Sequence, residues 1–384
     1  MAYRKLRAGK IFDGMRMLEN QMLVISEQGK IIDLLPAVEN DESVEQYNGI
    51  LSPGLINCHC HLELSHLKGI IPEHTGLVDF VTQVVAKRRM PEETIQSAII
   101  KAEKNMLANG IVAVGDICNT ADTVIQKQKG LLLYHNFIEL SGWSPSIAAS
   151  RWEDGHSLME KFRLSGSVRN SIVPHAPYSV SKNLWQIMSP GFYGQVVSMH
   201  NQETAFEDDF FRNGSGDLNR MFEMLNISNE HYMASGISSL QTVFSNLSGA
   251  QRIILVHNSF TTGDDISYVN THAAAGQVFY CLCINANQYI ENTVPPIHLF
   301  RQNHCSMVLG TDSLASNHQL DLMKEIQAIR NFFPSIPLEE CLQWATLNGA
   351  RALQVEKELG SFEKGKTPGI ILIDAENYSA ERLV

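Results

Sequence analysis

The sequence predicts an α/β fold, a (β/α)8 TIM-like barrel with a small discontinuous β-sandwich domain. Three observations lead to this prediction: short apolar runs recur along the chain, helical patterns lie between them, and both ends of the chain show short strands with turns. Strands that alternate with helices are typical of a parallel sheet, and eight such units form a barrel. The eight candidate strands are 50–58, 111–115, 132–139, 171–175, 195–200, 253–257, 277–283 and 307–310.

Two helical segments show the period most clearly. Residues 94–109 place apolar side chains on one face at helical spacing, and Gly110 follows as a stop signal. Residues 319–333 repeat the pattern and end before Pro334. Both segments are expected to be helices that pack on the barrel.

The terminal segments differ from the middle of the chain. The stretch MLVISEQGKIIDLLPA predicts a strand, a turn at Gly29 and a second strand, and GSFEKGKTPGIILID predicts short strands near the other end. The simplest arrangement pairs these segments with each other. We therefore expect residues 1–52 and 358–384 to form the β-sandwich domain, and residues 53–357 to form the barrel.

Composition excludes several classes of function. The net charge is −11, from 30 basic and 41 acidic residues without a Lys/Arg cluster, so neither a nucleic-acid nor a membrane partner is expected. Seven cysteines are an odd number at low density, which favours a reducing compartment. The first residues lack the apolar stretch of a secretory signal, and no apolar run approaches the ~18 residues of a membrane span. We expect a cytoplasmic protein.

The stretch LINCHCHLE ends the first barrel strand and combines two histidines with two cysteines. Successive side chains of a strand point to opposite faces, so His59 and His61 share one face while Cys58 and Cys60 share the other. A cysteine-based metal site would need a second pair, and the C-x-C pair within 281–283 sits in an apolar run that indicates burial. The histidine pair is therefore the better metal-binding candidate.

Several other candidate strands also end in histidine or aspartate, and in a (β/α)8 barrel these ends meet at one mouth. Imidazole and carboxylate groups suit zinc, iron and related divalent ions. The expected ligands of one such ion are His59, His61, His200 and Asp312. A position would remain for water, whose pKa the ion lowers toward ~7.

Two further residues are candidates for proton transfer. Glu203 lies three residues after His200, where it could take a proton from the water and return it to the substrate. The alternative for Glu203 is an exposed loop carboxylate. His257 could orient the water or polarise the electrophile, and its alternative is a core histidine. Together with Asp312, these two form the predicted catalytic set.

Four residues are candidates for substrate contact. Glu63 continues the alternation of positions 59 and 61 and should face the same side, either toward the substrate or in a structural hydrogen bond. His175, Ser313 and Asn317 follow strand ends and are placed to touch a ligand. The surrounding loops, 67–89 and 206–229, are expected to set specificity.

The motifs PGLINCHCH, PHAPYSVS, HNQE, LVHN and GTDSLASN, in this order, resemble the amidohydrolase superfamily. The most similar branch contains the aminohydrolases of purine and pyrimidine rings and the triazine hydrolases. The resemblance implies the barrel and sandwich, the four metal ligands above, proton transfer by Glu203 and His257, and a homodimer. Dinuclear branches carry a lysine at the end of the fourth strand, where this chain has His175, so the resemblance implies a single ion, zinc or iron.

A narrower similarity and one departure bear on the substrate. H-x-H-x-E-x-S, starting at His59, is similar to the aminodeoxyfutalosine deaminases. The seventh strand reads CINANQYI where the family pattern is C-P-x-S-N, so Ile284 and Ala286 differ while Asn287 remains. Substrate contacts inherited from the family are therefore not assumed.

Three hypotheses follow. The first is metal-dependent hydrolytic deamination of an aminated heterocycle, such as a purine nucleoside or aminodeoxyfutalosine, with release of ammonia. The alternative keeps the metal but changes the electrophile, as in a chlorohydrolase or a cyclic amidohydrolase. The third is an inactive relative that serves as a binding protein, which the complete ligand set disfavours.

Overall fold

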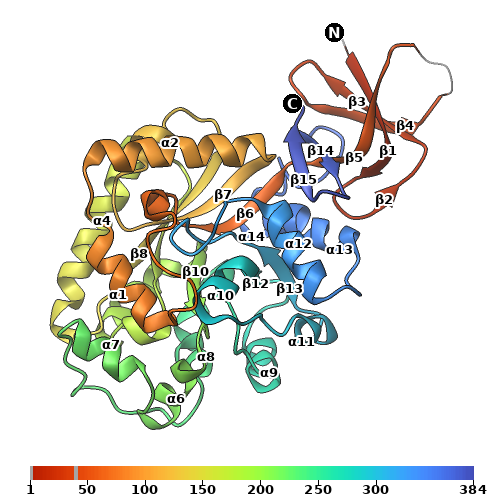
Figure 1. Cartoon of the computed structure of the whole chain (residues 1–384). Coiled ribbons are helices and arrows are strands. Elements are labelled where there is room, and N and C mark those ends of the chain that lie inside the picture. The colour runs from red at the N-terminus through yellow and green to blue at the C-terminus, as the bar shows by residue number, and fades with distance from the viewer. Residues whose placement is uncertain (1–2, 39–41) are drawn as a thin grey trace.

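The computed structural model describes residues 3–38 and 42–384, and two parallel sheets occupy the middle of this chain (Figure 1). The first contains β6 (Leu55–Cys60), β7 (Ile111–Cys118), β8 (Leu133–Leu140) and β9 (Asn170–Pro174). The second contains β10 (Val196–Asn201), β11 (Arg252–His257), β12 (Val278–Leu282) and β13 (Ser306–Leu309). Almost all of their residues are buried, as expected for strands covered on both faces. The eight parallel strands lie where the apolar runs predict them.

The two sheets meet at the C-terminal ends of their edge strands. Between β9 and β10, the His200 amide donates to the His175 carbonyl at 2.9 Å. Between β13 and β6, the Thr311 and Asp312 amides donate to the His59 carbonyl at 3.0 and 3.1 Å. Regular ladders do not continue across these two junctions in the described residues. Both junctions therefore join predicted site residues directly.

Helices surround the parallel sheets, and both predicted helices are confirmed. Helix α2 (Glu92–Ala108) buries Ile99 and Met106 and ends before Gly110, which has φ +80°. Helix α12 (Leu322–Phe332) covers the second expected segment. The other helices are α1 (Leu77–Lys87), α3 (Val124–Lys127), α4 (Ala148–Leu164), α5 (Lys182–Met188), α6 (Ala205–Asn213), α7 (Leu218–Met224), α8 (Ser239–Val243), α9 (Gly263–His272), α10 (Ile284–Glu291), α11 (Ile297–Gln302), α13 (Leu338–Gln343) and α14 (Gly349–Ala352). No helix in the described part of the chain is long and apolar enough to cross a membrane.

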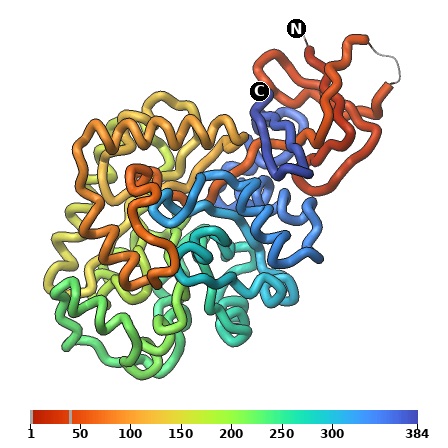
Figure 2. Tube along the Cα trace, viewed as in Figure 1, coloured from red at the N-terminus to blue at the C-terminus, as the bar shows by residue number. Residues whose placement is uncertain are grey.

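The two ends of the chain share a third sheet, which lies beside the parallel sheets (Figure 2). Its strands are β1 (Tyr3–Phe12), β2 (Met17–Leu18), β3 (Gln21–Ser26), β4 (Ile31–Pro36), β5 (Val44–Pro53), β14 (Ile370–Asp374) and β15 (Ser379–Arg382). Strand β14 pairs antiparallel with β5, and Gly29, with φ +76°, lies in the predicted turn between β3 and β4. The predicted pairing of the two terminal segments is confirmed.

Two details differ from the predictions. The run 50–58 is not one strand, because β5 ends at Pro53 and β6 begins at Leu55 in a different sheet. Gly54 makes this transition, and a Cβ there would lie 2.2 Å from Val112 Cγ1. The terminal segments form a single seven-stranded sheet in the described residues, so a two-layered sandwich stays a prediction.

Candidate metal centre and catalytic cavity

The structure brings the four predicted metal ligands together at the mouth formed by the strand ends. His59 lies near the end of β6, His200 in β10 and Asp312 just after β13, while His61 follows β6 directly. All four are buried. Side chains from three distant parts of the chain therefore converge because the parallel strands end at the same edge.

The spacing of their polar atoms suits one ion. His61 Nε2 lies 3.1 Å from His59 Nε2 and 3.3 Å from His200 Nε2. Asp312 Oδ1 lies 3.5 Å from His59 Nε2 and 3.3 Å from His61 Nε2. Ligand atoms that bind one zinc ion through bonds of ~2.0–2.1 Å are roughly 3–3.5 Å apart, which also allows a further position for water when the coordination number expands to five. The donor set and its dimensions fit a divalent metal.

The pKa values of the four predicted ligands also suit a bound cation. Burial lowers the pKa of His59 to about 4 and that of His61 to about 3, so both imidazoles are neutral near pH 7, as metal ligation requires. Burial opposes ionisation of Asp312, yet the imidazoles around it hold its pKa well below the usual range. Burial would lower the pKa of His200, but Glu139 and other nearby carboxylates raise it to about 9. The site therefore favours a positive charge, either a proton or a metal ion.

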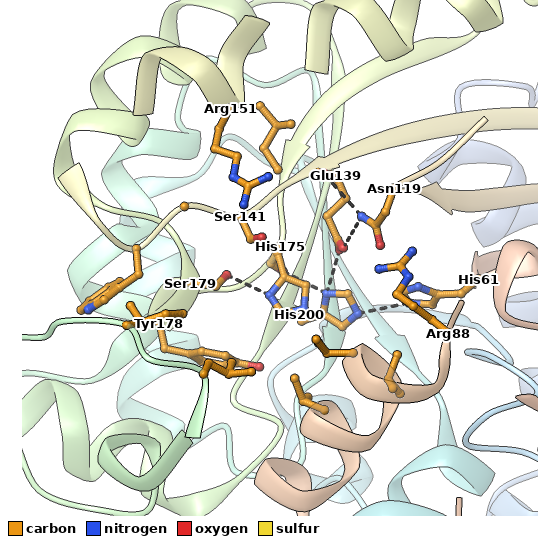
Figure 3. A pocket seen from close by; sticks show the side chains of 18 of the residues that line it. His61, Arg88, Asn119, Glu139, Ser141, Arg151, His175, Tyr178, Ser179 and His200 are labelled. Carbon is orange, nitrogen blue, oxygen red and sulfur yellow. Dashed lines mark hydrogen bonds and ion pairs between the residues drawn. The ribbon is translucent and has the colours of Figure 1, made fainter. Parts of the chain in front are cut away.

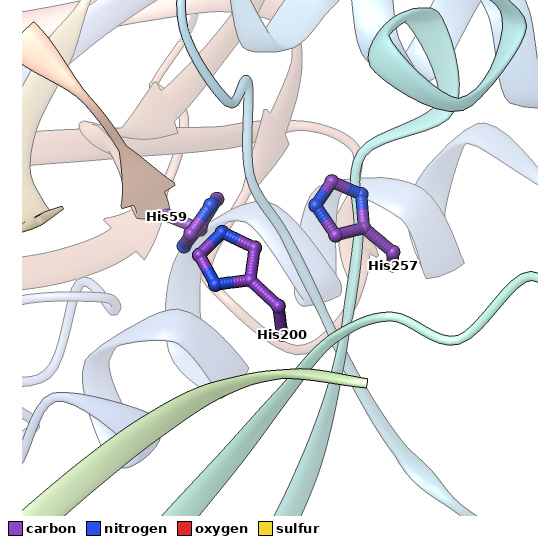
Figure 4. A group of neighbouring side chains, drawn as sticks. All are labelled: His59, His200 and His257. Carbon is purple, nitrogen blue, oxygen red and sulfur yellow. The ribbon is translucent and has the colours of Figure 1, made fainter. Parts of the chain in front are cut away.

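Both predicted proton-transfer residues border the same cluster, and Figure 4 shows one of them, His257, beside His59 and His200. His257, from β11, stacks with His200 at 5.5 Å between ring centroids, and its Nε2 lies 3.6 Å from Glu203 Oε1. His257 Nδ1 is 2.8 Å from Asn287 Oδ1, which orients the ring. Burial raises the pKa of Glu203 to about 8, with the neighbouring Asp312 adding to the effect, so the carboxyl can hold a proton near neutral pH.

Several residues at the strand ends of the site have a strained, left-handed backbone conformation. The backbone is left-handed, with positive φ, at Gln202 (43°), His257 (71°), Asn258 (57°) and Asp312 (57°). Such conformations cost on the order of 1–3 kcal/mol for residues other than glycine and concentrate at functional sites. Here they turn the chain sharply at strand ends, so that neighbouring side chains enter the mouth. The Asn258 amide donates to the Asn201 carbonyl at 3.0 Å and holds one of these turns.

A cavity of about 1010 Å³ opens in front of the cluster (Figure 3). His61, His200, Glu203, His257 and Asp312 line its inner end. The outer wall comes mainly from α1, α4, α7 and the segment after β8. It combines apolar side chains with charged ones on α4, and it includes Leu77, Phe80, Val84, Trp143, Met221, Phe222, Arg151, Asp154 and Lys161. Both segments expected to set specificity therefore contribute to the wall, although they contain helices.

The four predicted substrate residues divide into two groups. His175 and Ser313 line the cavity, and His175 Nδ1 lies 2.8 Å from Ser179 Oγ. Glu63 and Asn317 are not among the described residues that line it. The Asn317 amide group donates to the Thr311 carbonyl and to Glu325 Oε1, both at 2.9 Å.

Glu63 is used entirely by protein contacts. Strand β6 ends at Cys60, and a 3₁₀ turn (Leu62–Leu67) follows, so the alternation that predicts its direction no longer applies. Arg88 Nη2 donates to its Oε1 at 2.8 Å, and Thr120 donates to its Oε2 through the amide and the hydroxyl, each at 2.9 Å. The structure therefore assigns Glu63 the second of its two expected roles, a structural hydrogen bond.

Three residues escape the sequence prediction. Glu139, at the end of β8, lies 3.3 Å from His200 Nδ1 through its Oε1, and Asn119 Nδ2 donates to its Oε2 at 3.0 Å. Arg88 follows α1 and lines the cavity beside them. Glu139 closes the predicted strand 132–139, so its position at a strand end was a usable signal. Asn119 and Arg88 carried no comparable signal.

Known proteins resemble this chain over most of its length. A 5-methylthioadenosine/S-adenosylhomocysteine deaminase from Teredinibacter turnerae is 25% identical over 95% of this chain and 82% of its own. Helicobacter pylori aminofutalosine deaminase, in complex with methylthio-coformycin, has a similar structure, with a TM-score of 0.79, 21% identity and coverage of 96% and 92%. The zinc complex of atrazine chlorohydrolase TrzN from Arthrobacter aurescens TC1 has a TM-score of 0.72 and is 17% identical. The match covers 96% of this chain and 86% of the chlorohydrolase chain.

These two structures establish the kind of fold. The family assignment comes from the sequence itself, because the model of the Amidohydrolase family matches residues 50–383. That match includes every residue of the cluster and the cavity described above. The chain belongs to the Amidohydrolase family.

Proposed function

We propose that this protein is a metal-dependent deaminase of an aminated heterocycle, with an adenosine-type nucleoside as the leading substrate class. The observation that carries the proposal is the contact of a buried acid–imidazole pair, Glu203 and His257, with the His59, His61, His200 and Asp312 cluster at the inner end of a large cavity. The deaminase names of the sequence relatives support the same class of reaction.

We propose His59, His61, His200 and Asp312 as the ligands of one divalent ion, with zinc favoured over iron. Such an ion supplies an activated water molecule and polarises the reacting group. The donor atoms and the neutral imidazoles of His59 and His61 fit this role, and at His200 the ion would replace the proton that Glu139 favours. The remaining steps belong to side chains of the protein.

Glu203 then carries the proton transfers, and His257 orients the water. The Glu203 carboxyl delivers a proton to a ring nitrogen while water oxygen attacks the carbon that carries the amine. The carboxylate takes one proton from the attacking water and passes it to the departing amine. The remaining hydroxyl proton then returns to the Glu203 carboxylate and regenerates the acid. The carbon–nitrogen bond breaks, a carbon–oxygen bond forms, and ammonia leaves. His257, held by Asn287, orients the water through Nε2.

Substrate contacts are proposed for His175 and Ser313, which line the cavity. We further propose that the two parallel sheets act as one (β/α)8 barrel, residues 53–357, beside a β-sandwich domain of residues 1–52 and 358–384. A cytoplasmic location and a homodimer complete the proposal. Size-exclusion chromatography with light scattering tests the dimer.

The decisive experiment is a screen for ammonia release with elemental analysis of the same preparation. The substrates are 5-methylthioadenosine, S-adenosylhomocysteine, 5'-deoxyadenosine, aminodeoxyfutalosine, guanine, cytosine and a chlorinated aminotriazine. We expect stoichiometric ammonia from at least one adenosine-type nucleoside and one metal ion per chain. Chloride release or ring opening without ammonia would support the alternative hydrolase, and inactivity of a fully metal-loaded protein would contradict the proposal.

A further inference from the structure

Two buried carboxylates fasten the chain immediately after His61 to the end of strand β7. Asp116 Oδ1, from β7, accepts the Leu62 amide at 2.8 Å. Glu63 Oε2 accepts the amides of Asn119 and Thr120, beyond the end of β7, at 3.1 and 2.9 Å. The two sets of hydrogen bonds run in opposite directions, so they resist sliding of one segment past the other.

The fastening is located where regular strand pairing is interrupted. Asn57 pairs with Val114, and Cys60 pairs with Asp116. Between these two pairs, β6 contains one residue more than β7. A bulge of this kind disrupts the ladder locally, and it falls at the position of His59. The 3₁₀ turn that begins at Leu62 also has no side-chain cap from His61 in the described structure. Asp116 provides the hydrogen bond that the local backbone lacks.

A dedicated cation neutralises Asp116. Lys127, in α3, places Nζ 2.5 Å from Asp116 Oδ2, and the two side chains are 7% and 0% exposed. Lys127 also donates to Asn136 Oδ1 at 2.7 Å, and its Nζ lies 4.8 Å from the ring centre of Tyr134. A buried carboxylate is costly without such a partner. Lys127 is not among the described residues that line the cavity, so it can influence the site only indirectly, and its ion pair with Asp116 is the contact that leads to Leu62.

We propose that Asp116 and Lys127 form a clamp that fixes Leu62 and thereby holds His61 in position for the metal before the ion binds. The clamp rests on the proposed metal site and assigns two positioning residues to it. Asp116 supplies the acceptor for the Leu62 amide, and Lys127 keeps the acceptor charged and immobile. Glu63 and Arg88 form a second pair of this kind, in which Glu63 binds the segment after β7 and Arg88 neutralises the carboxylate. Arg88 Nη2 lies 2.8 Å from Glu63 Oε1.

A pair of double variants separates the clamp from a general effect of buried charge. Asp116→Asn with Lys127→Met removes both charges but keeps an oxygen acceptor for the Leu62 amide. Asp116→Leu with Lys127→Met removes both charges and the acceptor. The readouts are the zinc dissociation constant from chelator competition and the unfolding midpoint of the metal-free protein.

We expect the asparagine variant to bind zinc within a few-fold of the unmodified protein. The leucine variant should bind it roughly 10–100-fold more weakly, the usual range for loss of a group that supports a ligand. A merely structural role would lower the unfolding midpoint without separating the two zinc affinities. Equal affinities in two folded variants would overturn the clamp.

Hydrogen exchange of the unmodified, metal-free protein gives a second test that does not depend on variants. The Leu62 amide should be protected as strongly as the Val114 amide in β7, and far more than the amide of exposed Lys68. Exchange of Leu62 at the rate of Lys68 would refute a preformed clamp. If the unmodified protein binds no zinc, the proposed metal site fails while this measurement still decides the clamp.

Discussion

The inner end of the cavity and its outer wall are built by different parts of the chain. The inner end consists of residues at the ends of β6, β10, β11 and β13, which parallel ladders and two junctions hold in place. The wall comes mainly from α1, α4, α7 and the segment after β8. Hydrogen-bonded strand ends define positions closely, whereas helices over the mouth can change in length and angle without disturbing the sheets. The inner end is suited to a common chemistry, and the wall to the choice of substrate.

Removal of a metal ligand should have the largest effect. His61→Ala takes one imidazole from the cluster, so we expect loss of bound metal together with loss of measurable turnover. Elemental analysis and an ammonia assay check both outcomes. His74→Ala is the matched control, because His74 is exposed and outside the cavity lining. Full activity of a metal-free His61 variant would contradict the proposal that the inner end of the cavity carries the chemistry.

Removal of the acid should separate chemistry from metal binding. Glu203→Gln keeps the shape of the side chain but cannot exchange a proton, so turnover should fall roughly 10²–10⁴-fold with the metal retained. Glu207→Gln is the control, since Glu207 is buried nearby but accepts the Gln202 amide instead of lining the cavity. A Glu203 variant with normal turnover would remove this residue from the mechanism.

A change in the wall should alter substrate binding alone. Val84 lies on α1 and lines the cavity. Val84→Ala removes apolar contact, so KM should rise about tenfold while kcat and metal content stay near their original values. Steady-state kinetics with the best substrate from the screen provide the measurement. A fall in kcat with unchanged KM would show that the wall and the inner end are not independent.

The smallest effect concerns stability and pH. Burial raises the pKa of Glu207 from 4.5 to about 8. The folded protein therefore binds this proton more tightly than the unfolded chain, and its contribution to the free energy of unfolding is greatest below pH 4.5. That contribution falls as the pH rises toward 8 and is constant above it, with a slope of at most about 1.4 kcal/mol per pH unit.

Glu207→Gln should flatten this dependence between pH 4.5 and 8. Urea unfolding of the two metal-free proteins at several pH values isolates the difference, because other groups titrate in both. Parallel stability curves would show that Glu207 does not carry the raised pKa.

The same contrast explains how much the sequence can predict. The period of two along β6 places His59 and His61 on one face, and the structure brings both to the cluster. The period still holds for His61, one residue past the end of β6, but the 3₁₀ turn that begins at Leu62 ends it. Its extension to Glu63 therefore leads to a residue that binds Arg88 and Thr120 instead. Periodic inference fails once a different element begins, and the point at which that happens is defined by hydrogen bonds that a single sequence does not display.

The wall is less accessible to prediction for a different reason. Segment 67–89 was expected to be important for specificity, but its sequence does not say that α1 lies over the mouth or that Arg88 reaches Glu63. Those positions depend on packing between segments far apart in the chain. Glu139 is an intermediate case, since it ends a predicted strand but its contact with His200 depends on the arrangement of neighbouring strands.

The shared terminal sheet also constrains how the molecule can assemble during synthesis. Strand β5 lies between β1 and β14, and Ile50–Pro53 pairs with residues 370–373. Until the ribosome has made that distant partner, β5 presents unpaired amides and carbonyls along one side. Such an edge is a template for pairing with other chains. Incomplete chains that stop before residue 370 should therefore be aggregation-prone, even when their parallel sheets are intact.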